Sequence, residues 1–170
     1  MYSIMIVEDE YLVRQGIASL VDYEQFGMQV IAQAENGREA WQKFQENPAD
    51  ILLTDINMPK MNGLELAKLV RDQAPKCHIV FLTGYDDFDY ARTAIKLGAD
   101  DYLLKPFSKD DVEEMLTKVQ IKLDKERKKA QIQNLVDQGQ RSELEEAIQA
   151  RLADSELSLK SLAFQLGFSP

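Results

Sequence analysis

Short runs of apolar residues alternate with amphipathic stretches over the first 105 residues of the chain. Runs that are apolar almost throughout are typical of strands buried on both faces. Because strands that alternate with helices pair in parallel through right-handed crossovers, the pattern predicts an α/β fold. Five units are too few for an eight-stranded barrel, so we expect an open sheet with helices on both faces. The five expected strands are Ser3–Val7, Gln29–Ala34, Ile51–Thr54, Ile79–Thr83 and Tyr102–Leu104.

Apolar residues recur at helical spacing between these runs. The helix after the fifth run is expected to be long, because no glycine or proline interrupts it before Gly139. Its second heptad position turns polar after Val119, which favours a connector over a strong coiled coil. The apolar stripes are Val13, Ile17, Leu20 and Val21; Ala40, Trp41 and Phe44; Leu66, Leu69 and Val70; Ala91, Ala94 and Ile95; and Val112, Met115, Leu116, Val119 and Leu123.

A further helical segment begins near residue 142. It ends at Gly167, and Ser169-Pro170 has the form of an N-cap followed by a first-turn proline, which predicts another helix. We therefore expect three parts: a domain at 1–120, a helical linker at 121–141 and an incomplete helical domain at 142–170. The stripes of the third part are Leu144, Ile148 and Leu152, then Leu159, Leu162, Ala163 and Leu166.

The formal net charge of −9 comes from one end of the chain. Residues 1–124 carry 22 acidic and 13 basic side chains, whereas residues 125–170 carry seven of each. The first part should therefore repel nucleic acid, so that any DNA contact must come from the tail or from a domain to which the tail leads.

Other features of the sequence exclude membrane-spanning, secreted and disulfide-rich classes of protein. No apolar run approaches the roughly 18 residues of a membrane helix, and no secretory signal is visible. Cys77 is the single cysteine, which excludes an intramolecular disulfide and a multi-cysteine zinc site. These features favour a soluble cytoplasmic protein.

Polar residues lie at the ends of four of the five expected strands. Glu8 and Asp9 follow the first strand, and Asp55 follows the third. Thr83 ends the fourth, and Lys105 follows the fifth. The carboxyl ends of parallel strands meet at one edge of a sheet, where open α/β sheets bind ligands. In a 2-1-3-4-5 strand order the first and third strands are neighbours, so the three carboxylates should converge.

This convergence has a chemical consequence. Neighbouring carboxylates raise one another's pKa, and a hard divalent cation relieves the repulsion. Mg²⁺ prefers carboxylate and carbonyl oxygens, so we expect a magnesium site, completed by a backbone carbonyl near Asn57. Lys105 offers a movable positive charge, and Thr83 offers a hydroxyl donor. Phosphoryl transfer to a carboxylate requires this combination, which makes Asp55 the expected nucleophile.

Four separated motifs resemble those of the receiver domain of bacterial two-component response regulators. They occur in the right order and spacing over about residues 1–120. The resemblance implies a flavodoxin-like, doubly wound sheet of order 2-1-3-4-5 and phosphorylation of Asp55 by a sensor histidine kinase. The motifs are IMIVEDE (Ile4–Glu10), LLTDINMPKMNGLEL (Leu52–Leu66), FLTGYDD (Phe81–Asp87) and ADDYLLKPF (Ala99–Phe107).

The same resemblance implies roles for individual residues. The chain would not be an enzyme in its own right, but would accept a phosphoryl group and assist its own phosphorylation and dephosphorylation. A cis Lys105-Pro106 bond is also implied, and Glu8 stands where many members carry aspartate. The implied roles are Mg²⁺ binding by Glu8, Asp9 (the direct ligand), Asp55 and the backbone carbonyl of Asn57; phosphoryl binding by Thr83 and Lys105; and a switch aromatic at Tyr102.

The tail carries a second resemblance. LSLKSLAFQLGFSP (Leu157–Pro170) is similar to the start of an AraC-type helix-turn-helix DNA-binding domain. Its recognition helix would begin near Ser169-Pro170 and is absent from this chain. The resemblance implies a transcription regulator that binds DNA only through that further domain.

Phosphorylation would turn Tyr102 inward, and homodimerisation through the fourth helix, fifth strand and fifth helix would carry the signal.

Three other functions fit the sequence less well. A magnesium-dependent phosphatase would need a second aspartate where this chain has Asn57. A flavin mononucleotide carrier would need a phosphate-binding loop of small residues after the first strand, where Glu8-Asp9-Glu10 repels phosphate. A degenerate receiver would lack some of the key residue types, all of which are present.

Other polar residues have simpler expected roles. Cys77 and His78 are expected to be ordinary residues before a strand, and Trp41 is expected to pack in or near the core. The basic run Lys125–Lys129 is expected to be a solvated helix face.

Overall fold

The computed structural model describes residues 1–84, 93, 96–137 and 145–149. Five parallel strands form one sheet of order β2-β1-β3-β4-β5, which confirms the doubly wound order. Each strand agrees with its expected run to within one residue at either end, because long apolar runs mark strands that are buried on both faces. The strands are β1 (Tyr2–Val7), β2 (Met28–Ala34), β3 (Ile51–Asp55), β4 (His78–Thr83) and β5 (Asp101–Leu104).

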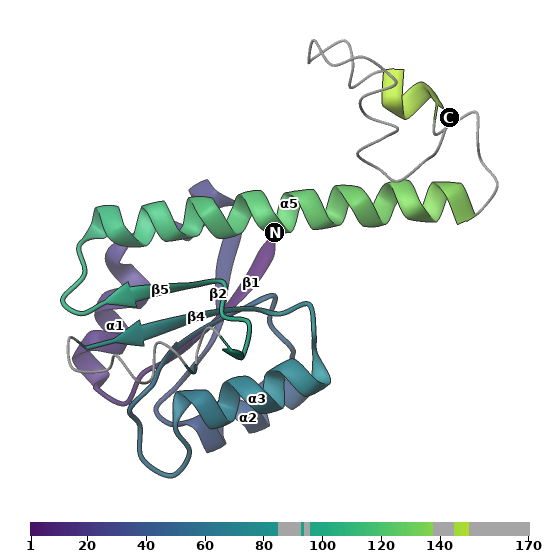
Figure 1. Ribbon diagram of the computed structural model, residues 1–170. Coiled ribbons are helices and arrows are strands. Elements are labelled where there is room, and N and C mark those ends of the chain that lie inside the picture. The colour runs from purple at the N-terminus through teal and green to yellow at the C-terminus, as the bar shows by residue number, and fades with distance from the viewer. Residues whose placement is uncertain (85–92, 94–95, 138–144, 150–170) are drawn as a thin grey trace. The chain divides into compact units, whose positions relative to one another are not determined.

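Helices cover both faces of this sheet, as expected. Figure 1 shows α2 and α3 side by side on one face, with the first part of α5 on the other face. The predicted helix with Ala91, Ala94 and Ile95 lies outside the described residues. The helices are α1 (Tyr11–Leu20), the 3-10 helix η1 (Tyr23–Phe26), α2 (Gly37–Glu46), α3 (Gly63–Gln73) and α5 (Lys109–Asp137).

Alternate residues of the strands fill two layers of core. Met5 and Val7 of β1 pack with Phe44 of α2 and Val70 of α3 in one buried cluster. The intervening residues of β1, such as Ile6, are equally buried and point to the other face. The whole predicted stripe of α5, from Val112 to Leu123, is also buried. Each such aliphatic side chain contributes about 1.5–3 kcal/mol to stability when fully buried.

The helix α5 is 29 residues long and forms the predicted helical extension. It passes from the first compact unit, Met1–Ile121, into the second, Lys122–Pro170. Residues 145–149 are helical, but most of the expected third part at 142–170 lies outside the described residues. None of the helices within the described ranges is long and apolar enough to span a membrane.

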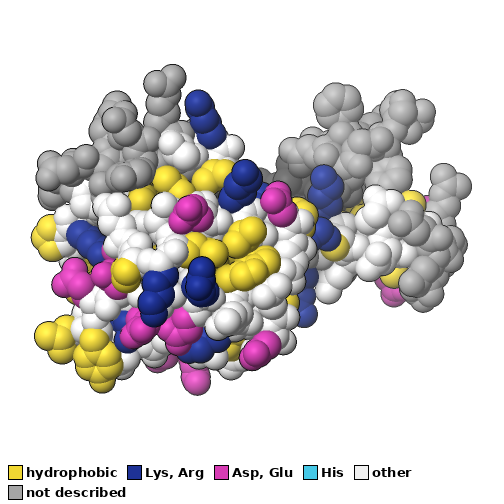
Figure 2. All heavy atoms as spheres, turned by 90° about the horizontal axis from the view of Figure 1, so that it is seen from below, with side chains coloured by type: hydrophobic (Ala, Val, Ile, Leu, Met, Phe, Trp, Pro, Cys, Tyr) yellow, Lys and Arg dark blue, Asp and Glu magenta, His cyan; other side chains and the backbone are white. Residues whose placement is uncertain are grey.

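Charged side chains of both signs mix on the face that carries α2 and α3. Figure 2 shows basic and acidic side chains interspersed with hydrophobic ones on this side. A nucleic-acid-binding face would carry a basic patch or stripe instead. The described side chains on this one face therefore form no basic patch or stripe.

A polar cluster fixes the amino-terminal end of β4. His78 is the first residue of that strand rather than a residue before it, which corrects the sequence-based expectation. Its Nδ1 lies 2.9 Å from Oδ1 of Asp100, and Oδ2 of Asp100 accepts a hydrogen bond from the amide of Ile79. The histidine is buried because this carboxylate satisfies its ring, an arrangement that hydrophobic patterning does not encode.

Cys77 lies beside this cluster and should be chemically inert. Its side chain is buried, and burial raises the pKa of the thiol to about 12. Only the thiolate attacks disulfide reagents, so the native thiol should react roughly 100-fold more slowly than in urea-unfolded protein. Reaction with an aromatic disulfide at pH 8, followed by absorbance, measures both rates. Equal rates would mean that this end of the sheet opens readily.

Candidate functional site

Three carboxylates converge at the carboxyl ends of β1 and β3. Val7 pairs with Thr54, so Glu8, Asp9 and Asp55 emerge side by side from adjacent strands. One carboxylate oxygen from each residue lies within 4.8 Å of the others. Glu8 is fully buried and Asp55 is 7% exposed, whereas Asp9 is exposed to solvent. We call these three residues the acidic cluster.

Lys105 supplies a positive charge to the acidic cluster. Its Nζ lies 2.7 Å from Oε2 of Glu8 and 3.2 Å from Oδ2 of Asp55. Burial lowers the pKa of the lysine, but the hydrogen bond to Glu8 and the charge of Asp55 outweigh burial, so the pKa is raised overall. Lys105 is therefore a permanent cation in this site. The Lys105-Pro106 peptide bond is cis, as expected.

The electrostatics of the cluster favour a second cation. Burial raises the pKa of both Glu8 and Asp55 above the ordinary carboxyl value, against the opposing effect of Lys105. The negative charge of Asp55 adds to the rise at Glu8. One lysine cannot neutralise three carboxylates, and all the side-chain donors are hard oxygen atoms. The donor set therefore fits a hard divalent cation.

Backbone amides fix the directions of the buried carboxylates. The amide of Ile56 donates to Oδ1 of Asp55 at 2.7 Å. The amide of Glu10 donates to Oε1 of Glu8 at 3.2 Å. Both oxygens of Glu8 thus have partners within the chain, one from this amide and one from Lys105.

Two other expected site residues lie near the acidic cluster: Thr83 on the neighbouring strand, and Asn57 just after Asp55 in the chain. Thr83 is 5% exposed and ends β4, where Leu82 pairs with Asp55 of the neighbouring strand. The carbonyl of Thr83 accepts a hydrogen bond of 2.7 Å from the amide of Lys105. Asn57 is exposed, two residues beyond Asp55.

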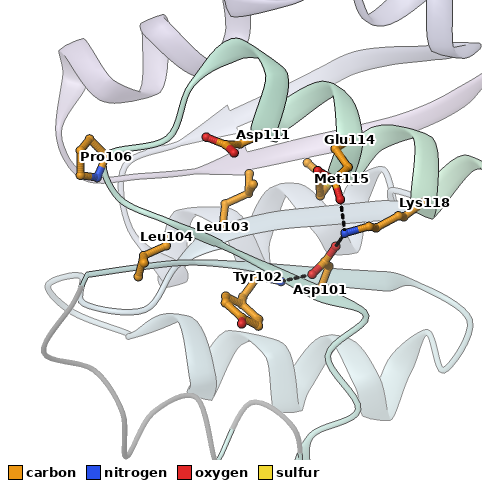
Figure 3. Close-up of a pocket in the computed structure, with 9 residues that line it drawn as sticks. All are labelled: Asp101, Tyr102, Leu103, Leu104, Pro106, Asp111, Glu114, Met115 and Lys118. Atoms are coloured by element: carbon orange, nitrogen blue, oxygen red, sulfur yellow. Dashed lines mark hydrogen bonds and ion pairs between the residues drawn. The ribbon is translucent and has the colours of Figure 1, made fainter.

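The structure does not bring Tyr102 into the acidic cluster. Its side chain is 63% exposed, and Figure 3 shows it on the opposite face of β5 from Leu103. A depression of about 410 Å³ lies here between β5 and the start of α5. Lys118 bridges the two elements, with Nζ 2.8 Å from Glu114 and 3.8 Å from Asp101 (Figure 3). The depression is thus lined by charged side chains together with apolar residues such as Leu104 and Met115.

The sequence analysis missed Gly63, which supports the backbone of Asp55. Its amide donates to the carbonyl of Ile56 at 2.9 Å, and a Cβ here would overlap the carbonyl oxygen of Asp55. A capping box between Asn62 and Glu65, with bonds of 2.9 and 3.0 Å, fixes the start of α3. The Asn62-x-x-Glu65 spacing is a sequence signal for the start of a helix, and it could have identified Gly63 as the first helical residue.

We expect Gly63→Ala to lower the free energy of unfolding by about 2–4 kcal/mol, because the methyl group would overlap the backbone of Asp55. Urea denaturation at neutral pH measures the change. Gly16→Ala is the matched control, since a Cβ at Gly16 has no neighbour within 4 Å. That helical site should gain about 0.5–1 kcal/mol. Equal stability of the two variants would contradict the close approach of Gly63 to the backbone of Asp55.

Comparison with known proteins agrees with this geometry. Residues 4–117 match the model of the response regulator receiver domain. The chain is 38% identical over 112 residues to the uncharacterized transcriptional regulatory protein YesN of Bacillus subtilis (strain 168). It is 40% identical over 112 residues to the transcriptional regulatory protein LnrK of the same strain. Each match covers 66% of this chain, but only 30% of YesN and 50% of LnrK.

Solved structures have the same fold. The REC domain of AraT, a response regulator from Geobacillus stearothermophilus, is 42% identical, with a TM-score of 0.72. That match covers 74% of this chain and 98% of the other. A two component transcriptional regulator AraC from Clostridium phytofermentans ISDg is 34% identical, with a TM-score of 0.66, over 71% of this chain and 94% of the other. With the fold and the family match in agreement over two thirds of its length, this chain belongs to the response regulator receiver domain family.

Proposed function

We propose that this chain is the phosphorylation-controlled part of a two-component transcriptional regulator, and that Asp55 accepts the phosphoryl group from a sensor histidine kinase. One observation carries the proposal: the Asp55 carboxylate lies beside two further carboxylates and 3.2 Å from the ammonium of Lys105. This is the arrangement that phosphoryl transfer to a carboxylate needs.

Mg²⁺ is the proposed cofactor. Glu8, Asp9, Asp55 and the backbone carbonyl of Asn57 would hold it, with exposed Asp9 as the direct ligand. When bound, the ion supplies positive charge that neutralises the phosphoryl oxygens in the transition state. The hard-oxygen donor set and its excess negative charge support this choice of metal.

The chain's own residues perform the transfer. A carboxylate oxygen of Asp55 attacks phosphorus on the kinase phosphohistidine, so that an O–P bond forms as the P–N bond breaks. The imidazole leaves with the bonding electron pair and takes a proton from solvent. Lys105, oriented by its 2.7 Å bond to Glu8, donates to one phosphoryl oxygen, and the Thr83 hydroxyl donates to another. Both groups orient the phosphoryl group without reacting.

The added charge would switch the conformation of the domain. A phosphoryl group adds about −1.5 to −2 charges, which would draw Lys105 and Thr83 toward it. Tyr102 would then turn inward from its exposed position and remodel the face of β5 and α5. Homodimerisation through this face, or through α5, would carry the signal along the helix.

The output of the switch is proposed to be gene regulation in the cytoplasm. The chain spans between 30% and 50% of the length of YesN and LnrK, both named as transcriptional regulatory proteins. The resemblance of residues 157–170 to an AraC-type domain supports a helix-turn-helix effector that begins near residue 142. DNA would be bound by that effector alone.

Intact-mass spectrometry tests the phosphoacceptor function directly. Incubation with Mg²⁺ and a small phosphodonor should add one phosphoryl group, and a chelator should prevent the addition. Calorimetric titration with Mg²⁺ runs in parallel. If the metal binds but no phosphoryl group is added, the proposed function is wrong, and the domain signals through some other contact.

A further inference from the structure

The loop that connects Asp55 to α3, residues 56–62, is held at two points. We call it the phosphoacceptor loop. At its base, the amide of Gly63 donates to the carbonyl of Ile56 at 2.9 Å. Near its far end, the amide of Gly37, the first residue of α2, donates to the carbonyl of Met61 at 3.1 Å. The second contact joins the loop to a helix that contributes no residue to the acidic cluster.

Gly37 is required there because of space rather than backbone conformation. Left-handed φ values occur at Gly27 and Gly98 among the described glycines, and Gly37 does not share them. A Cβ on Gly37 would lie 2.5 Å from the carbonyl oxygen of Met61 and 2.8 Å from its Cγ. Because the first of these atoms belongs to the backbone, a side chain at position 37 would displace the loop itself.

The start of α2 is a rigid support for this contact. The side chain of Asn36 accepts a hydrogen bond of 3.0 Å from the amide of Glu39 and so caps the helix. Ala40 and Phe44 are fully buried, which fixes the helix against the core. The amide of Gly37 is therefore presented in one position, fixed by contacts outside the phosphoacceptor loop.

The loop itself contains a strained turn that needs such support. Lys60 has a φ of 68°, in the left-handed region, and the amide of Met61 donates to the carbonyl of Pro59 at 2.8 Å. This hydrogen bond joins residues i and i+2 and closes a γ-turn with a positive φ at its centre, a turn that L-amino acids rarely adopt. Strained backbone persists only where the surroundings hold it in place. The Gly37 contact falls on the residue next to the strain.

We propose that Gly37 is a positioning residue for the phosphoacceptor site. By holding Met61, α2 keeps the loop in the one conformation that presents Asp55 and the carbonyl of Asn57 to a metal ion. The inference rests on the proposed function, because it assumes that these groups bind Mg²⁺. Coupling between two sites is reciprocal, so metal binding must in turn stabilise the Gly37–Met61 hydrogen bond.

Hydrogen exchange on the unaltered protein tests this coupling. Saturating Mg²⁺ should slow exchange of the Gly37 amide by roughly tenfold, the size of an ordinary coupling between sites. The amide of Asn47, which donates to the carbonyl of Lys43 at the other end of α2, should be unaffected. Equal changes at both amides, or no change at Gly37, would overturn the proposal.

A substitution tests the same idea from the other direction. Gly37→Ala should weaken Mg²⁺ binding on the order of tenfold by calorimetry. Gly16→Ala, which adds the same methyl group where nothing lies within 4 Å, should leave the affinity unchanged. Val119→Ala, which makes a cavity at a fully buried site in α5, should lower the denaturant midpoint without changing the affinity. A purely structural role of Gly37 would make it behave like Val119.

The two levels of inference fail in different ways. If the unaltered protein does not bind Mg²⁺, the proposed function is wrong and the role of Gly37 falls with it. If the protein binds Mg²⁺ but the Gly37 amide and the Gly37→Ala affinity stay unchanged, only the positioning role is wrong. Should Gly37→Ala fail to fold, hydrogen exchange on the unaltered protein still decides.

Discussion

Replacing Asp55 with asparagine is expected to abolish phosphorylation of the chain and to leave it folded. The amide lacks the anionic oxygen that attacks phosphorus, while its carbonyl oxygen can still accept the 2.7 Å hydrogen bond from Ile56. Burial raises the pKa of Asp55, which means that its charge is unfavourable in the folded state. The neutral variant should therefore be at least as stable as the parent, as is common where function requires a buried charge.

The measurement combines intact mass after phosphodonor treatment with a urea denaturation curve. Asp50→Asn is the matched control, because Asp50 lies at the other end of the sheet, where its carboxylate accepts two hydrogen bonds of 2.8 Å from Ser3. That variant should be phosphorylated at the parent rate. A phosphoryl group on Asp55→Asn would show that another carboxylate, such as Asp9, is the acceptor.

Replacing Lys105 with glutamine is expected to destabilise the fold at neutral pH and to slow phosphorylation strongly. The side chain of Glu8 is fully buried and would lose its cation, which lies 2.7 Å away. Breaking a fully buried ion pair costs about 3–5 kcal/mol. Because the Lys105 side chain is 23% exposed, solvent reduces the loss, and we expect about 2–3 kcal/mol.

This loss should depend on pH with a defined sign. The pKa values of Glu8 and Asp55 are raised by burial in the folded state. The stability linked to a raised carboxyl pKa is present below the unfolded pKa and is lost as pH rises through the folded value. Removing Lys105, which opposes that rise at both groups, raises the two pKa values further. The stability gap between variant and parent should therefore widen from pH 5 to pH 7.

Urea denaturation at pH 5, 6 and 7 measures this gap. Lys118→Gln is the control, because the side chains of Lys118 and of its nearer partner Glu114 are 55% and 69% exposed, and an exposed ion pair contributes little. Its stability should stay close to that of the parent at each pH. Added Mg²⁺ should restore part of the Lys105→Gln loss, since a bound cation replaces the missing charge. A gap that is constant with pH would show that Glu8 does not depend on Lys105.

Much of this molecule follows from local pattern. Each strand was predictable to within one residue, because a strand buried on both faces must be apolar along its length. The strand order then determined that Glu8 and Asp55 emerge at neighbouring strand ends, and the structure brings them together. The buried stripe of α5 was predictable for a similar reason, since its apolar residues recur with helical spacing.

The tertiary structure decided which polar groups pair. Lys105 lies nearer to Glu8 than to Asp55, a preference that depends on the path of the chain after β5. His78 is part of β4 because its backbone pairs with Ile51 of β3, and the carboxylate of Asp100 lies against its ring. Sequence spacing does not encode such contacts, because their partners come from separate segments whose distance is set by packing.

The roles of two glycines also came only from the structure. Gly37 and Gly63 each lie where a Cβ would overlap the backbone of another segment, at Met61 and Asp55 respectively. Sequence determined the fold and the residue types at the strand ends, because hydrophobic periodicity and strand order are properties of the chain itself. The close approach of α2 to the phosphoacceptor loop results instead from how two helices pack on one face of the sheet, and no single segment contains that information.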